Sequence, residues 1–167
     1  MSIRPRSLRA LGAAAAGLAL IGLAACGSDE PERDENTNEI VEAGDADVFA
    51  IAVGDCVTDD AGSTGEVSEV SEVPVVPCTE PHASEVFHSY DIPASTLPAE
   101  AEMQAIVEEQ CLGSFETFVG LPYEQSTLDI TWLEPTSGSW DGGDRELLCM
   151  VFDPAGDVTG SLAGVAR

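Results

Sequence analysis

Five cysteines constrain this chain more than any other feature, and the segment before the first of them determines the environment of the other four. The chain begins with Arg4, Arg6 and Arg9 and has no acidic residue in this region. An apolar, alanine-rich run from Ala10 to Leu23 follows, and small residues stand at its end. A basic start, a short apolar run and a small-residue junction predict a secretory signal peptide.

The end of this leader is more specific than its composition. The sequence Leu23-Ala24-Ala25-Cys26 resembles the lipobox of bacterial lipoproteins. The resemblance implies cleavage before Cys26 and a diacylglyceryl thioether on its sulfur, so that residues 1–25 are removed. A transmembrane anchor and an ordinary signal peptide are the alternatives, but an apolar run of about 14–16 residues is short for a bilayer span of roughly 20. Two acyl chains give stable anchoring, and the expected location is the outer face of the cell membrane.

The four remaining cysteines are the main constraint on the folded part of the chain. Cys56, Cys78, Cys111 and Cys149 are even in number and follow an export signal, which predicts two disulfide bonds. A zinc site is the alternative, but the chain has no C-x-x-C pair and only two histidines. Spacing alone leaves all three pairings of the four cysteines open.

Charge is divided unevenly along the chain. All 31 acidic residues follow Cys26, and they face only Arg33, Arg145 and Arg167 and no lysine, so the formal charge of the mature chain is −28. Such a field opposes binding to nucleic acid, which depends on Lys and Arg. It is typical of a solvated surface, and it attracts basic partners weakly at physiological salt. We therefore expect no nucleic-acid partner.

Removal of the leader leaves 142 residues, which fit one domain. Residues 26–48 comprise the lipidated cysteine and a polar, acidic segment that is poor in large apolar side chains. Such a segment buries too little surface to offset the entropy of ordering, so it is predicted to be a disordered tether. The folded domain is predicted over residues 49–167.

Hydrophobic periodicity predicts strands around one central helix. Apolar residues recur at helical spacing from Pro98 to about Val119, with Cys111 on the buried stripe, and Gly120 ends the helix. Residues 135–144 are predicted to form a loop. Strands are predicted over 49–57, 66–76, 85–90, 128–133 and 146–152, with a short one at 160–162. The predicted fold class is α+β, a single domain with a mainly antiparallel sheet packed on one central helix and stapled by two disulfides.

The order of several short motifs resembles a known family. These motifs are Gly54-Asp55-Cys56-Val57, Val76-Pro77-Cys78, Pro81-His82, Glu85-Val86-Phe87, Cys111, Pro135, Trp140, Gly143-Asp144-Arg145, Cys149 and Gly160-Ser161-Leu162. Over about residues 52–162 the pattern is similar to the septum formation domain of exported and membrane-tethered proteins of high-GC Gram-positive bacteria. The resemblance implies an extracytoplasmic domain, linked by name to cell division, without an established enzymatic activity. It also implies pairing of Cys56 with Cys78 and of Cys111 with Cys149.

Candidate catalytic residues are few. The sequence contains no nucleophile elbow, P-loop or dinucleotide fingerprint, so no catalytic residue, metal or cofactor is expected. His82 and Glu85 are the best acid–base candidates, although His82 can equally brace a turn. Calcium near Asp141 and Asp144 is disfavoured because the EF-hand spacing is absent.

A second cluster indicates binding. Trp140, Asp144 and Arg145 form a candidate interaction loop, and Arg145 is expected to pair with a carboxylate and to order the loop. The leading hypothesis is a membrane-anchored extracytoplasmic lipoprotein with a non-enzymatic binding or structural domain, which binds an envelope protein or a cell-wall component. The alternatives are a small envelope hydrolase that uses His82 and Glu85, and a solute-binding lipoprotein.

Overall fold

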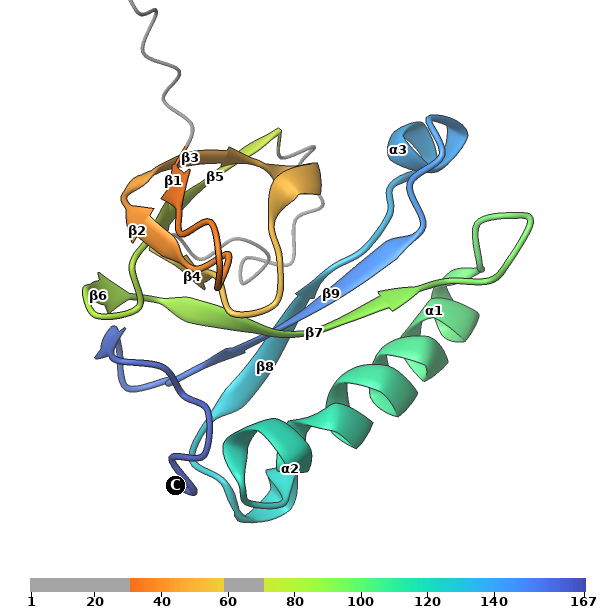
Figure 1. The fold of residues 1–167 in the computed structure, drawn as a ribbon. Helices are drawn as coiled ribbons and strands as arrows, with labels where there is room; N and C mark the ends of the chain where they lie inside the picture. The colour runs from red at the N-terminus through yellow and green to blue at the C-terminus, as the bar shows by residue number, and fades with distance from the viewer. Residues whose placement is uncertain (1–30, 59–70) are drawn as a thin grey trace, which may run out of the picture.

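The computed structural model describes residues 31–58 and 71–167, and Figure 1 shows their arrangement. The predicted signal peptide and the lipidation of Cys26 lie outside these residues, as does the first part of the strand predicted over 66–76. Within the described part of the chain, no helix combines the length and hydropathy needed to cross a membrane.

The central feature is an antiparallel sheet of six strands that curls on itself (Figure 1). Its strands are β3 (Gly44–Asp47), β4 (Cys56–Val57), β5 (Glu72–Val76), β7 (Ser84–Asp91), β8 (Asp129–Leu133) and β9 (Glu146–Phe152). Their order is β3-β5-β4-β7-β9-β8, so β3 and β8 form the two edges. The long central pair places Ser84 opposite Phe152 and Asp91 opposite Glu146, with a bulge between Val86 and His88.

Strand β9 is apolar from Leu147 to Phe152 because both of its faces are covered, as in any strand buried on two sides. Leu147, Cys149 and Val151 join a core cluster together with the buried side of the helix. Leu148 and Met150 point to the other face and join a second cluster inside the curl of the sheet. The domain therefore has two apolar cores, one on each side of β9.

One helix runs from Glu100 to Val119 and lies along one side of the sheet (Figure 1). It consists of α1 (Glu100–Val107), a π-helical turn η2 (Glu108–Leu112) and α2 (Gly113–Val119). It ends at Gly120, whose φ of 85° lies in the left-handed region that favours glycine. The helix predicted from Pro98 to Val119 is confirmed, with a start two residues later.

The buried stripe of this helix explains the π turn. Met103, Val107, Cys111, Phe115 and Val119 are all buried, and each follows the previous one by four residues. Because an α-helix repeats every 3.6 residues, four such steps in a pure α-helix would rotate the stripe by about 160°. The wider π turn takes up part of this rotation and keeps Cys111 on the side that faces the sheet.

Both disulfides connect elements that are distant in the sequence. Cys111 pairs with Cys149, which ties the helix to β9, and Cys56 pairs with Cys78, which ties β4 to the segment after β5. These are the two pairings that the family resemblance implies, and they are confirmed together with the α+β fold class.

The N-terminal segment differs most from the prediction. A disordered tether over residues 26–48 is wrong from residue 32 onward, because β1 (Glu32–Arg33) pairs with β2 (Ile40–Glu42) and β3 extends the main sheet by pairing with β5. Ile40 and Ala46 are buried in the cluster inside the curl. Composition does not predict this order, since two apolar side chains pack on a core that other residues build.

The strand predicted over residues 49–57 is also largely wrong. A short 3-10 helix, η1 (Val48–Ala50), follows β3, and only Cys56–Val57 at the far end form a strand. The Asp47 carboxylate caps η1 by accepting a hydrogen bond from the Phe49 amide at 2.9 Å. This cap turns the chain away from the sheet and leaves Phe49 64% exposed.

The other elements agree with the prediction except in two places. The strands predicted over 85–90, 128–133 and 146–152 are β7, β8 and β9, and the described part of 66–76 contains β5. The loop predicted over 135–144 contains a short helix, α3 (Ser137–Asp141). The strand predicted at 160–162 is wrong, because the last strand is β10 (Val158–Thr159), which pairs with β6 (Pro81–His82).

Candidate functional site

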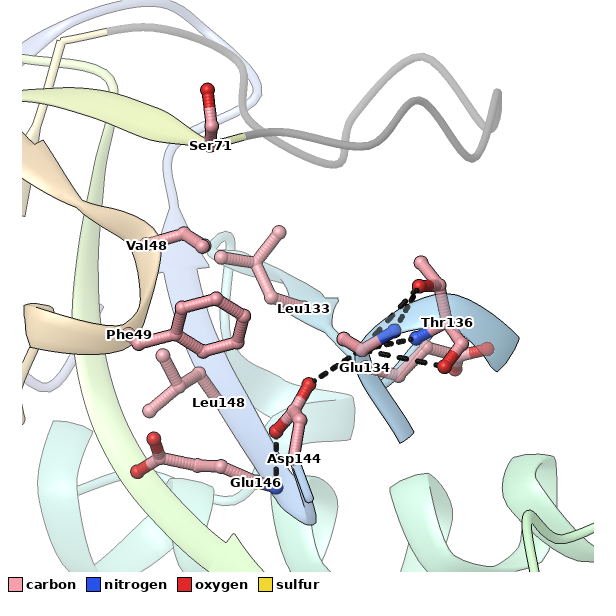
Figure 2. Close-up of a pocket in the computed structure, with 10 residues that line it drawn as sticks. Val48, Phe49, Ser71, Leu133, Glu134, Thr136, Asp144, Glu146 and Leu148 are labelled. Atoms are coloured by element: carbon pink, nitrogen blue, oxygen red, sulfur yellow. Dashed lines mark hydrogen bonds between the residues drawn. The ribbon is translucent and has the colours of Figure 1, made fainter. Parts of the chain in front are cut away.

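An apolar groove lies between the two edges of the curled sheet (Figure 2). Val48 and Phe49 directly follow edge strand β3, and Leu133 is the last residue of edge strand β8. Leu148 on β9 lies between them and is 3% exposed. The groove has a volume of about 250 Å³. Its lining is completed by Ser71, Glu134, Thr136, Ser139, Asp144 and Glu146.

Three carboxylates, those of Glu134, Asp144 and Glu146, line this groove and are called the acidic rim below. Each accepts a hydrogen bond from a neutral donor. The Trp132 indole N–H donates to Glu134 at 2.8 Å, and the Ser89 hydroxyl donates to Glu146 at 2.5 Å. Such bonds orient the carboxylates but leave their charges in place. Among the residues described, no basic side chain forms an ion pair with the acidic rim.

The α3 loop holds Asp144 at the rim. Thr136 caps α3 by accepting from the Ser139 amide at 3.1 Å, and the Ser139 hydroxyl donates to Asp144 at 2.8 Å. The other oxygen of Asp144 accepts from the backbone amide of Glu146 at 2.9 Å. Asp144 thus bridges α3 and the start of β9, and these two contacts fix its carboxylate at the rim.

The other two residues of the predicted interaction loop have structural roles. Trp140 is 6% exposed and belongs to the core beside the helix. The Arg145 guanidinium stacks on its ring at 3.7 Å from the centroid and donates to the Trp140 carbonyl oxygen at 2.8 Å. The carboxylate partner expected for Arg145 is wrong for the described residues, because a cation–π contact and backbone carbonyls take its place. Of the three loop residues, only Asp144 lines the groove.

His82 and Glu85 lie in the interior and away from the groove. His82 is 0% exposed, and its Nδ1 donates to the Glu80 carbonyl oxygen at 2.8 Å. Glu85 is 2% exposed and accepts from the Ser161 hydroxyl at 2.7 Å and the Leu162 amide at 2.6 Å. Burial raises the pKa of Glu85, although these two bonds and the nearby His82 oppose the rise. This geometry makes Glu85 a clamp for the C-terminal segment.

A metal centre is not supported at this position. Ligand atoms of Cys56, Cys78 and Glu85 lie within 4.8 Å of one another. The two sulfurs are joined in a disulfide, so neither is a thiolate that can bind a metal ion.

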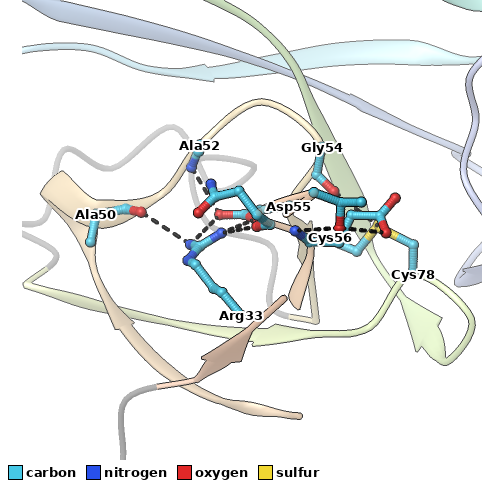
Figure 3. A network of polar contacts seen from close by, with 10 residues as sticks. Arg33, Ala50, Ala52, Gly54, Asp55, Cys56 and Cys78 are labelled. Atoms are coloured by element: carbon cyan, nitrogen blue, oxygen red, sulfur yellow. Dashed lines mark hydrogen bonds and ion pairs between the residues drawn. A yellow bond between two sulfur atoms is a disulfide. The ribbon is translucent and has the colours of Figure 1, made fainter. Parts of the chain in front are cut away.

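A buried ion pair that sequence reasoning missed fastens the N-terminal segment to the domain (Figure 3). Both terminal nitrogens of Arg33 donate to the Asp55 carboxylate at 2.7 Å, and one also donates to the Ala50 carbonyl oxygen at 3.1 Å. Asp55 is 2% exposed and further accepts from the Ala52 amide at 2.8 Å. The hydrogen bond to Asp55 raises the pKa of Arg33. The one available signal was that Arg33 is the sole basic residue of an acidic segment.

The groove also escaped sequence reasoning, because its residues resemble ordinary strand and surface positions. Phe49 reads as the start of a strand, and Leu148 belongs to a continuous apolar run. Glu134 and Glu146 are two acidic residues among 31. Asp47, a residue type that favours helix-capping positions, stands two residues before Phe49 and was the only local sign that Phe49 lies outside the sheet.

Fold and site together define a small, disulfide-stabilised α+β domain with an open apolar groove. Comparison with protein families then gives its membership: the chain belongs to the septum formation family, whose model matches residues 52–165. No curated protein and no solved structure matches the chain.

Proposed function

We propose that the mature protein is a lipoprotein, anchored through Cys26 at the outer face of the cell membrane, whose domain binds an envelope partner in septum formation. Membership of the septum formation family supports a role in cell division or the cell envelope. The observation that carries the binding role is the groove, in which Phe49 is 64% exposed beside an acidic rim that forms no ion pair with any described basic side chain. Exposed apolar surface edged by polar groups is characteristic of interaction sites.

The groove favours a binding protein over the alternatives. Its volume of about 250 Å³ is below the roughly 300–1,000 Å³ of sites that enclose a small-molecule ligand, which argues against a solute-binding lipoprotein. The proposed hydrolase pair is disfavoured by burial, since His82 and Glu85 are at most 2% exposed and offer a substrate no access.

The ion pair of Arg33 with Asp55 determines how far the domain stands from its anchor. Only seven peptide steps separate Cys26 from Arg33, and they span at most about 25 Å even when fully extended. A tether that ran to residue 48 would allow a far greater reach. On the proposed anchoring, the domain is therefore held near the membrane surface by the β1–β2 pair.

Fractionation and microscopy of the full chain, fused at its C-terminus to a fluorescent protein, test this function. We expect the protein in the membrane fraction and enriched at division septa, and we expect Cys26→Ser to be lost from the membrane fraction. An even distribution around the cell, with normal septa after deletion of the gene, would contradict the division role. Membrane association that survives Cys26→Ser would contradict the lipid anchor.

A further inference from the structure

The acidic rim has no counter-ion available from the chain after Cys26. That part of the chain contains three basic side chains apart from its histidines. Arg33 is bound to Asp55 and Arg167 to Asp153, at 2.7 and 2.6 Å. Arg145 is stacked on Trp140 and donates to backbone carbonyl oxygens. On the proposed cleavage before Cys26, a basic side chain that pairs with the rim therefore belongs to another molecule.

The apolar side of the groove leaves a large hydrophobic side chain exposed to water. Phe49 is the most exposed large apolar side chain among the described residues, at 64%, and it lies with Val48, Leu133 and Leu148 in the groove (Figure 2). Burial of such a side chain removes apolar surface from water, which is the dominant favourable term in most protein association. The groove thus offers an apolar floor and a negative rim side by side.

We infer that this groove binds a protein segment that presents one apolar side chain flanked by lysine or arginine. The inference rests on the proposed function and names the chemistry of its partner. The apolar side chain fills the space between Phe49, Leu133 and Leu148, and the flanking cations face Glu134 and Glu146. A volume of about 250 Å³ suits one or two side chains, as in the pockets that receive the anchor residues of a protein interface.

Charge complementarity also gives the site its selectivity. A neutral apolar segment leaves the rim carboxylates without a counter-charge when it covers them, and an acidic segment is repelled. A cation without an apolar neighbour leaves the floor in contact with water. Only a segment with both features pairs with the rim and covers the floor. Because Glu134 is exposed and Asp144 and Glu146 are only partly buried, the charge contribution should fall as salt screens it.

Surface plasmon resonance with the full chain held in neutral phosphatidylcholine nanodiscs tests the inference. The probe is the peptide Gly-Gly-Lys-Leu-Lys-Gly-Gly, and empty nanodiscs serve as the blank. One comparison peptide replaces leucine by serine and another replaces both lysines by glutamine. We expect both comparison peptides to bind at least fivefold more weakly than the probe, and we expect probe binding to weaken between 50 and 500 mM salt.

Matched variants separate the groove from the rest of the surface. Phe49→Ser should weaken binding at least tenfold, whereas Val53→Ser, which alters a 53% exposed apolar side chain outside the groove, should leave it within twofold. Glu134→Gln combined with Glu146→Gln should weaken binding about two- to fivefold per charge. The same charge change at Glu109 and Glu116 on the helix is the control and should have less than a twofold effect.

Equal binding of all three peptides, or equal effects of Phe49→Ser and Val53→Ser, would overturn the inference. Binding of soluble wall stem peptides in a Phe49-dependent way, without binding of the lysine–leucine probe, would also overturn it and assign the groove to the cell wall. If the probe fails while the fused chain still gathers at septa, the proposed function stands and this partner chemistry is wrong.

Discussion

Replacing Arg33 by methionine should destabilise the protein by more than a surface ion pair can account for. Methionine keeps much of the aliphatic stem but removes two hydrogen bonds to Asp55, at 2.7 Å each, and those to the carbonyl oxygens of Asn38 and Ala50, at 3.1 Å each. Asp55 is 2% exposed, so its carboxylate stays buried with the Ala52 amide as its remaining hydrogen-bond donor among the residues described.

The magnitude follows from the burial of the two partners. Removing one member of a fully buried pair costs about 3–5 kcal/mol. Because the Arg33 side chain is 20% exposed and water compensates part of the loss, we take the lower end, about 3 kcal/mol. The matched control is Arg167→Met, since Arg167 is 45% exposed in its pair with Asp153, and such surface pairs contribute less than about 1 kcal/mol.

Urea unfolding followed by circular dichroism, with both disulfides intact, measures the two variants. Arg33→Met should lower the free energy of unfolding by about 2 kcal/mol more than Arg167→Met does, and a double-mutant cycle with Asp55→Asn should reveal coupling between the partners. Hydrogen exchange should accelerate at the amides of Asp34 and Asn38, which close the β1–β2 turn. If the free energies of unfolding of Arg33→Met and Arg167→Met lie within about 0.5 kcal/mol of each other, the ion pair of Arg33 with Asp55 contributes no more than a surface pair. The N-terminal segment then behaves as a free tether.

Two further predictions concern the interior. Burial raises the pKa of Glu85 above its ordinary value of 4.5, so the folded state holds this proton more tightly than the unfolded state does. The contribution of Glu85 to stability is therefore greatest below pH 4.5 and declines as the pH rises through the raised pKa. In urea unfolding between pH 4 and 7, Glu85→Gln should gain stability relative to wild type as the pH rises, and a constant difference would contradict this. The disulfides close loops of 38 and 22 residues, so replacing Cys111 and Cys149 together by alanine should cost about 3.9 kcal/mol and replacing Cys56 and Cys78 about 3.4 kcal/mol. A loss below about 1 kcal/mol for either pair would contradict the loop-entropy reasoning.

Elements with a strong local pattern could be predicted from the sequence. The helix and β9 carry uninterrupted apolar signals, and Cys111 and Cys149 lie on their buried sides. The disulfide pairing came from the family resemblance, since spacing leaves three pairings open. The π turn could not be predicted, although a spacing of four along the buried stripe departs visibly from 3.6.

Features that depend on distant contacts could not be predicted. The order of the N-terminal segment requires Arg33 to reach Asp55, 22 residues away, and composition contains no information about that contact. The groove exists because the sheet curls and brings the ends of β3 and β8 to one site. Asp144 belongs to a sequence motif and could be predicted as a candidate, whereas only the fold shows that Glu134 and Glu146 line the same groove.

The central claim is that this domain binds an envelope protein through the groove. It is tested most directly by photo-crosslinking in living cells, from the full chain carrying a photoreactive amino acid at position 49 or at position 53. We expect an adduct with one envelope protein from position 49 alone, at a peptide with lysine or arginine beside an apolar residue. That adduct should be lost on substitution of Glu134 and Glu146 by glutamine. Equal adducts from positions 49 and 53, or none from position 49, would contradict it.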